Sequence, residues 1–413
     1  MKKERLINIV IISLIVFISL YLISCETSTN NPQDNHVRAL SKTEEQIVAS
    51  SSNFGFNLFK EISNTETDQN IIISPLSIST AFGMALNGAE NLTYEQMRDV
   101  LGLINMSRDD INSSYKSVNN LLTGIDIKVE FTSANSIWYR TGFQVENSFL
   151  NVNRDFFNAE VTEADFDSPA TVNLINNWVK EATNEKIDKI IENIDRDLVM
   201  YLINAIYFKG TWQYQFDKDL TRDDQFNLIS GGTVPIKMMV QKNKFRYYGN
   251  SELQAIEMPY GNDAYEMIVV LPNQENNIDD LIQNFDADKF DLMKSNFTEH
   301  ELTLYFPRFK LEYESKLNDY LIALGMADAF SPTNADFRRI TTVEQIYISE
   351  VKHKTFIEVN EEGTEAAAVT SIGFSRTSIG DETELRVDRP FLFFIYEKNT
   401  NTILFVGKII NPS

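Results

Sequence analysis

Residues 351–370 constrain the fold of this chain more than any other stretch, because they read as one strand that continues beyond a turn. Before the turn, apolar or small polar side chains occupy every second position, namely Val351, His353, Thr355, Ile357 and Val359. After Gly363 the same period continues with Thr364, Ala366, Ala368 and Thr370. A period of two is that of a β-strand. Residues 366–375 contain no proline and no charge, so nothing in them prevents pairing in a sheet.

The same stretch also fits a loop. Gly363 permits a sharp turn, and Gly373, Ser375, Ser378 and Gly380 are typical of an exposed loop. A segment that suits both states predicts a stored conformational change. In this interpretation the part after Gly363 is a strand that is not yet in its sheet and enters it later.

Four further motifs surround this stretch in a fixed order. They are NIIISPLSI at residues 70–78, NAIYFKGTW at 204–212, DRPF at 388–391 and FVGKIINP at 405–412. Together with EEGTEAAAVT at 361–370, they resemble the signatures of the serpin superfamily over almost the whole mature chain. The chain as a whole resembles a bacterial inhibitory serpin made as a lipoprotein.

The resemblance implies a fold and an activity. The fold class is α+β, with a large central β-sheet, smaller sheets, about eight to nine helices and an exposed reactive-centre loop. The activity is inhibition of serine proteases as a suicide substrate, in which the cleaved loop inserts into the central sheet; it is not an enzyme and needs no cofactor. The residues implied as the loop hinge are Glu361, Gly363, Thr364, Glu365, Ala366, Ala367 and Ala368.

The residue types at the hinge favour an inhibitor. Relatives that do not inhibit often carry a charged or bulky residue at the first inserting position, whereas this chain has Thr364 there, followed by three alanines at 366–368. The alternative is a non-inhibitory serpin that acts as a ligand- or protein-binding module.

Two bonds are candidates for cleavage by the target protease. The family's usual spacing from Glu361 places the bond at Thr377-Ser378, which suits elastase-like proteases with small pockets. A loop one residue shorter places it at Arg376-Thr377, which suits trypsin-like proteases with an acidic pocket. Cysteine proteases are further possible targets.

Polar residues of the motifs match a cluster that controls opening of the central sheet in the family. Its members here are Ser74, Ser77, Asn204, His353 and Trp212. The tryptophan matches the place where the inserting loop first enters the sheet. Catalysis by these groups is disfavoured, because the chain has only three histidines and no G-x-S-x-G turn.

The first forty residues read as a targeting segment. Lys2, Lys3 and Arg5 precede an apolar stretch that ends at Cys25, which resembles the lipidated cysteine of a bacterial lipobox. We therefore expect a signal peptide at 1–24, a flexible tether at 25–39 and a serpin domain at 40–413. The expected location is the cell envelope, at the outer membrane and facing the periplasm or the cell surface. An uncleaved membrane anchor is the alternative.

The composition limits the classes of partner that we expect this chain to bind. A net charge of −22 disfavours nucleic acid and direct attraction to anionic lipid, so the membrane is reached through the lipid anchor alone. No metal-binding motif is present in the sequence, and a monomer is expected. Lys237, Lys242, Lys244 and Arg246 fit a solvated strand edge better than a glycosaminoglycan site.

Local patterns predict several elements. They are a helix from about 40 to 59, a helix capped by Ser74, a strand at 134–139, a helix at 172–182, a fully buried strand at 264–271, a short helix at 317–324 and a hairpin at 391–396 and 403–409. The resemblance implies that the helix at 172–182 lies across the main sheet.

Overall fold

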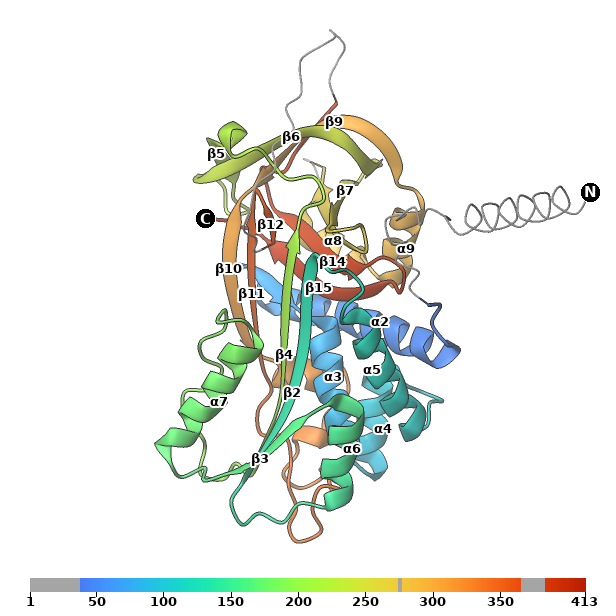
Figure 1. Cartoon of the computed structure of the whole chain (residues 1–413), viewed down its shortest axis with the longest axis vertical. Coiled ribbons are helices and arrows are strands. Elements are labelled where there is room, and N and C mark those ends of the chain that lie inside the picture. Colours follow the sequence, from blue (N-terminus) through green and yellow to red (C-terminus); the bar gives the residue numbers. More distant parts are fainter. Residues whose placement is uncertain (1–37, 274–276, 365–382) are drawn as a thin grey trace, which may run out of the picture. The chain divides into compact units, whose positions relative to one another are not determined.

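The computed structural model describes residues 38–273, 277–364 and 383–413. Within this part the chain forms two β-sheets and nine α-helices (Figure 1). The helices are α2 (Lys42–Thr65), α3 (Pro75–Leu86), α4 (Asn91–Val100), α5 (Arg108–Leu122), α6 (Asn147–Phe157), α7 (Pro169–Ala182), α8 (Ile278–Asn284), α9 (Ala287–Ser295) and α10 (Asn318–Ala323). The predicted α+β class and number of helices are confirmed.

Capping residues set where the helices begin. The Ser74 side chain accepts a hydrogen bond from the backbone N–H of Ser77, and Pro75 occupies the first turn, so α3 begins where the sequence predicts. Ser41 forms a reciprocal capping box with Glu44, which starts α2 at Lys42. The helix predicted at 172–182 begins earlier, because Ser168 caps α7 and Pro169 is its first residue.

One sheet has six strands in the order β10-β11-β12-β4-β2-β3. They are β10 (Phe309–Lys316), β11 (Lys352–Asn360), β12 (Gly363–Thr364), β4 (Met200–Thr211), β2 (Val129–Arg140) and β3 (Glu160–Ala164). All neighbours are antiparallel except β2 and β3. The alternation predicted from His353 to Val359 is confirmed, since these odd-numbered residues of β11 are buried and the even-numbered ones are only partly so.

The second sheet has nine strands in the order β1-β15-β14-β8-β7-β6-β9-β13, with β5 paired to β6. They are β1 (Ile71–Ile73), β5 (Arg222–Asn227), β6 (Thr233–Gly249), β7 (Leu253–Tyr260), β8 (Tyr265–Pro272), β9 (Thr298–Pro307), β13 (Glu384–Arg386), β14 (Phe391–Glu397) and β15 (Thr402–Ile409). Every residue of β8 is buried, as its continuous apolar run predicts. The predicted C-terminal hairpin is β14 and β15.

Helices cover both faces of the six-stranded sheet (Figure 1). Ile203 of β4 belongs to a small apolar core with Ile175 and Val179 of α7, whereas its neighbour Asn204 faces α3. Successive strand residues point to opposite faces, so α7 and α3 lie on opposite sides of this sheet. In the described residues no helix is both long enough and apolar enough to cross a membrane.

Candidate functional site: the hinge and the polar cluster

The turn between β11 and β12 requires a glycine. The Asn360 side-chain oxygen accepts hydrogen bonds from the backbone N–H groups of Glu362 and Gly363, at 2.9 and 3.2 Å. Gly363 adopts φ = +150°, and a Cβ atom there would overlap the carbonyl oxygen of Gly210. Only glycine fits both the conformation and the close approach of β4.

The first two residues after the turn already lie in the six-stranded sheet. Thr364 pairs with Val359 of β11 and with Gly210 of β4, and Gly363 pairs with Asn360 and Thr211. The expectation of a strand still outside its sheet is therefore wrong for these two residues. Within the described chain, β11 and β4 have no direct pairing with each other and are joined through β12.

A small hollow, with a cavity volume of about 10 Å³, lies where a longer β12 would run. It is lined from β4 by Ile206, Tyr207 and Phe208, from β11 by Phe356, Ile357 and Glu358, from the segment after α7 by Thr183, Lys186 and Ile187, and by Thr364. Because the two strands separate at this point, their facing edges provide backbone groups that an added strand could pair with.

The Thr364 side chain is fixed in a dry site. It is 3% exposed, and its hydroxyl lies 2.6 Å from the hydroxyl of Tyr260. Burial raises the pKa of Tyr260, so this phenol stays protonated. Trp212 stacks on the Tyr260 ring, with centroids 4.4 Å apart, and its Nε1 donates to the Asn360 carbonyl at 2.9 Å. Trp212 and Tyr260 therefore form one wall of the hinge.

The residues before Gly363 are anchored by the segment that follows β4. Backbone N–H groups of Phe216 and Trp212 donate to the carbonyls of Glu361 and Glu362, each at 2.9 Å. The Thr221 hydroxyl donates to the Glu361 carboxylate at 2.8 Å, and Arg308 lies 3.8 Å from that carboxylate. The hinge thus enters the sheet from a fixed point.

A second polar group lies at the N-terminus of α3. The Ser74 backbone N–H donates to His353 Nε2 at 3.2 Å, and the Ser77 hydroxyl donates to the Asn204 side-chain oxygen. Asn204 in turn donates to Asn135 of β2 at 2.7 Å. Burial lowers the pKa of His353 to about 3, so the ring is neutral and its Nε2 accepts.

The structure brings four of the five predicted cluster residues together. Ser74, Ser77 and Asn204 belong to one hydrogen-bonded network, and His353 joins it through the backbone of Ser74. Trp212 lies apart from them. It follows β4 directly and comes eight residues after Asn204, a separation of about 26 Å in an extended strand. Their role in sheet opening remains a prediction.

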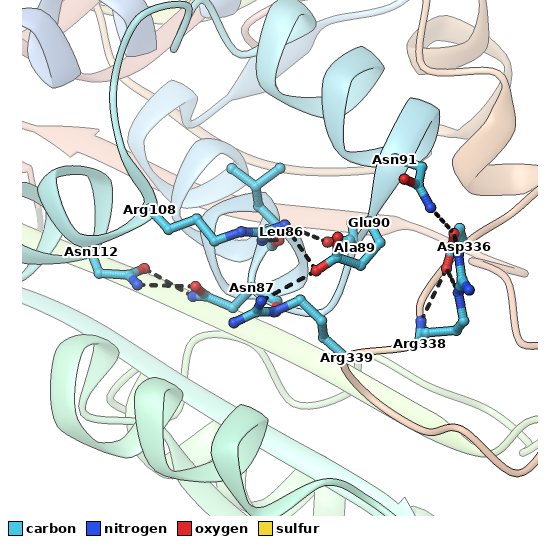
Figure 2. Close-up of polar contacts among 10 residues, drawn as sticks. All are labelled: Leu86, Asn87, Ala89, Glu90, Asn91, Arg108, Asn112, Asp336, Arg338 and Arg339. Atoms are coloured by element: carbon cyan, nitrogen blue, oxygen red, sulfur yellow. Dashed lines mark hydrogen bonds and ion pairs between the residues drawn. The ribbon is translucent and has the colours of Figure 1, made fainter.

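Two arginines that the sequence analysis missed hold the other end of α3 (Figure 2). Arg108 donates to the carbonyls of Leu86 and Ala89, and Arg339 donates to the carbonyl of Asn87 at 3.1 Å. Both arginines donate to carbonyls at the C-terminus of a helix, where positive charge is favoured. The only available signal in the sequence was that the last turn of α3 contains no lysine or arginine of its own to bind these carbonyls.

Glu90 joins the two arginines (Figure 2). Its carboxylate lies 3.2 Å from Arg339 and 3.8 Å from Arg108. Arg339 belongs to the segment that leads into β11, so one cluster connects α3 to the chain just before the strand that carries His353.

The basic residues at 237–246 do not form a free anion site. They lie on β6, where Lys242 and Lys244 pair with β9 alone, so the predicted strand edge is confirmed at these two residues, whereas Arg246 pairs with both β7 and β9. Lys237 pairs with Asp223 at 2.7 Å, Lys244 with Glu299 at 3.1 Å and Arg246 with Glu257 at 2.7 Å. Lys242 likewise lies 3.6 Å from Glu301.

Several predicted site residues lie outside the described chain. They are Cys25, the hinge residues Glu365, Ala366, Ala367 and Ala368, and the residues of the two candidate bonds, Arg376, Thr377 and Ser378. In the part that is described, no group of three or more histidine, cysteine or acidic side chains could hold a metal ion.

Comparisons with known proteins agree with this geometry. The family model described as "Serpin (serine protease inhibitor)" matches residues 49–412. An uncharacterized serpin-like protein of Methanosarcina acetivorans is 33% identical over 375 residues, covering 89% of this chain and 87% of the relative. The leukocyte elastase inhibitor of Xenopus laevis is 33% identical over 379 residues, covering 89% of this chain and 100% of the relative. The crystal structure of the thermophilic serpin tengpin in the native state has a TM-score of 0.81 and 34% identity, covering 91% of this chain and 95% of that one.

Proposed function

Because this chain belongs to the serpin family of serine protease inhibitors, we propose that it traps its target proteases covalently. The protease serine attacks a loop carbonyl, the amine side of the cleaved bond leaves, and the acyl ester joins the two proteins. The loop upstream of the cut then extends β12 and carries the protease with it. Trapping succeeds if the protease is distorted before water hydrolyses the ester.

The arrangement of β12 carries this proposal. Gly363 and Thr364 occupy the gap between β11 and β4, and the hollow continues from Thr364 along the same two strands. An extension therefore needs no new turn and no break of a direct β11–β4 ladder.

Order-of-magnitude energies support the same mechanism. About twelve inserted residues at about 3.3 Å each would move the acyl link roughly 40 Å. Some 12–20 new backbone hydrogen bonds at about 0.5–1.5 kcal/mol each would yield on the order of 10–20 kcal/mol. Removing one oxyanion-hole donor costs an enzyme about 3–4 kcal/mol, so insertion supplies enough free energy to disrupt several such contacts.

We assign the target class from the candidate bonds. Thr377-Ser378 fits elastase-like proteases, and Arg376-Thr377 fits trypsin-like proteases; a relative named leukocyte elastase inhibitor supports the first. The cell-envelope location belongs to the proposal as well. It is supported by the basic and apolar residues before Cys25, which would be acylated and hold the protein at the outer membrane.

A ligand-binding function has weaker support. The apolar hollow between α2, α8 and the C-terminal hairpin, lined by Phe56, Ile282 and Phe394 among others, has a cavity volume of only about 10 Å³. Pockets for drug-sized ligands usually measure about 300–1,000 Å³. The inhibitor is therefore the function that the geometry supports best.

Incubation with elastase and with trypsin, followed by denaturing gel electrophoresis and mass mapping of the cut, tests the proposal. An inhibitor gives a complex that survives the detergent, with the cut at Arg376-Thr377 or Thr377-Ser378. Arg376→Ala should abolish complex formation with trypsin and spare elastase, because a trypsin-like pocket pairs its carboxylate with the guanidinium. Clean cleavage without complex formation would contradict the proposal.

A further inference from the structure

A pair of buried carboxylates lies in the nine-stranded sheet, away from the hinge. Glu257 of β7 and Glu266 of β8 are 3% and 2% exposed. Pro259 pairs with Glu266 across these strands, so Glu257 is the diagonal neighbour of Glu266 on the same face. Two ionised carboxylates this close in a dry site repel each other, and burial disfavours the charge on each.

Tyr396 of β14 joins the two carboxylates. Its hydroxyl donates to Glu266 Oε2, and its oxygen lies 3.4 Å from Glu257 Oε1. One phenol has one hydrogen, so it serves only one of two ionised carboxylates. A proton on Glu257 Oε1 resolves this, because that hydroxyl then donates to Tyr396, which still donates to Glu266.

Cations surround the pair without neutralising it completely. Arg246 Nε of β6 lies 2.7 Å from Glu257 Oε2, and Lys398 Nζ lies 3.0 Å from Glu266 Oε1. Lys398 is shared with Asp263, also at 3.0 Å. Lys294 of α9 lies over the Tyr396 ring at 4.3 Å, with Asp291 and Glu397 nearby. Burial, and then Glu266, raise the pKa of Glu257 to about 7 in spite of these cations.

Helix α9 covers this group. Phe290 packs edge-on against Tyr396 with ring centroids 5.6 Å apart, and Lys294 lies over the same ring. Lys294 donates to the Asn401 side chain, which donates to Asp291 at 2.8 Å. Lifting α9 would therefore expose Tyr396 and the carboxylates to water.

We propose that Glu257 holds a proton in the folded protein near neutral pH, so that Glu257, Tyr396 and Glu266 form one hydrogen-bonded chain that fastens α9 to the nine-stranded sheet. The attachment of α9 to the sheet would then depend on pH, and it is separate from loop insertion. A folded-state pKa above the unfolded one gives stability that is full below about pH 4.5 and is lost as the pH rises through about 7. Local opening of α9 should increase over this window.

Hydrogen exchange of the α9 amides in the full chain tests the proposal. After correction for intrinsic exchange, opening should increase by up to about tenfold per pH unit between pH 5 and 7 and level off above, because one proton is released. Glu257→Gln supplies a permanent donor to Tyr396, so its α9 exchange should be nearly independent of pH. The matched control is Glu301→Gln, which removes an exposed carboxylate from β9 and should behave as the unchanged protein.

Equal pH dependence of α9 exchange in the unchanged protein and Glu257→Gln would overturn the proposal. If Glu257→Gln does not fold, infrared spectra of the unchanged protein decide. A protonated carboxyl band present at pH 6 and lost by pH 8.5 would support the proposed hydrogen-bonded chain, and absence of this band at pH 6 would refute it.

Discussion

In the six-stranded sheet, β11 and β4 are joined through the two residues of β12, whereas in the nine-stranded sheet β14 and β8 pair directly along six residues. The first sheet surrounds a hollow and holds its polar cluster at the end of a helix. The second is filled by aromatic rings such as Phe290 and Phe394, which lie 5.0 Å apart. In the mechanism that we propose, the first sheet accepts a strand and the second keeps its pairing.

The two regions also contain titratable groups whose pKa values are shifted in opposite directions. His353, on β11 of the six-stranded sheet, has a lowered pKa, whereas Glu257, on β7 of the nine-stranded sheet, has a raised one. Between about pH 4.5 and 6.5, falling pH therefore destabilises the first region and stabilises the second. In the unfolding free energy of the whole molecule these two contributions would partly cancel, so single variants are needed to separate the two regions.

The largest expected effect comes from a charge placed in the gap between β11 and β4. Thr364→Arg puts a guanidinium in a site that is 3% exposed, beside the Tyr260 hydroxyl. An unpaired buried charge costs several kcal/mol, so insertion should stall and the inhibitor should become a substrate. Complex formation with elastase and trypsin measures this. Thr333→Arg, at an exposed position, is the control and should still trap.

If Thr364→Arg forms stable complexes at the stoichiometry of the parent protein, the six-stranded sheet does not receive the loop, and the contrast between the two sheets has no functional meaning.

A smaller effect is expected from His353. Its pKa is lowered to about 3, below the usual 6.5 of an unfolded chain, so its contribution is present above pH 6.5 and is lost as the pH falls toward 3. His353→Gln keeps an acceptor for the Ser74 N–H but cannot be protonated. The unfolding free energy of the variant, followed by urea titration from pH 7 to 4, should decrease by a few kcal/mol less than that of the unchanged protein.

The matched control is His300→Gln, because His300 is exposed on β9 of the other sheet. It should follow the unchanged protein at every pH. Parallel pH curves for His353→Gln and the unchanged protein would show that the cluster at α3 does not sense protons.

The smallest effect is expected at the far end of α3. Arg339→Ala removes a hydrogen bond to the Asn87 carbonyl and an ion pair with Glu90, both partly exposed, so it should cost about 1–2 kcal/mol in urea unfolding. Arg338→Ala, whose partner is Asp336, should cost less because its side chain is 66% exposed. An equal loss in both variants would mean that α3 does not depend on the arginine at its C-terminus.

Features fixed by neighbouring residues were predictable from the sequence. The alternation of β11, the cap at Ser74 and the turn at Gly363 each depend on a few adjacent positions, and the structure has all three. The ion-pair partners of the basic residues on β6 were not predictable, because these partners are acidic residues on three other strands, β5, β7 and β9.

Contacts between distant segments explain the other misses. Arg339 reaches Asn87 across 252 positions, and Tyr396 reaches Glu266 across 130. No local period signals such pairs. Trp212 was grouped with the α3 cluster because its motif is shared with Asn204, but an extended strand separates its two ends by its full length.

The melting temperature before and after a single cut in the loop tests whether the loop inserts into the six-stranded sheet. A protease that cuts once between residues 372 and 378 frees the loop to extend β12 between β11 and β4 without removing any existing pairing. With insertion worth on the order of 10 kcal/mol or more, we expect the cut protein to melt on the order of 10 °C higher than the intact one. Equal melting temperatures of the cut and intact proteins would contradict it.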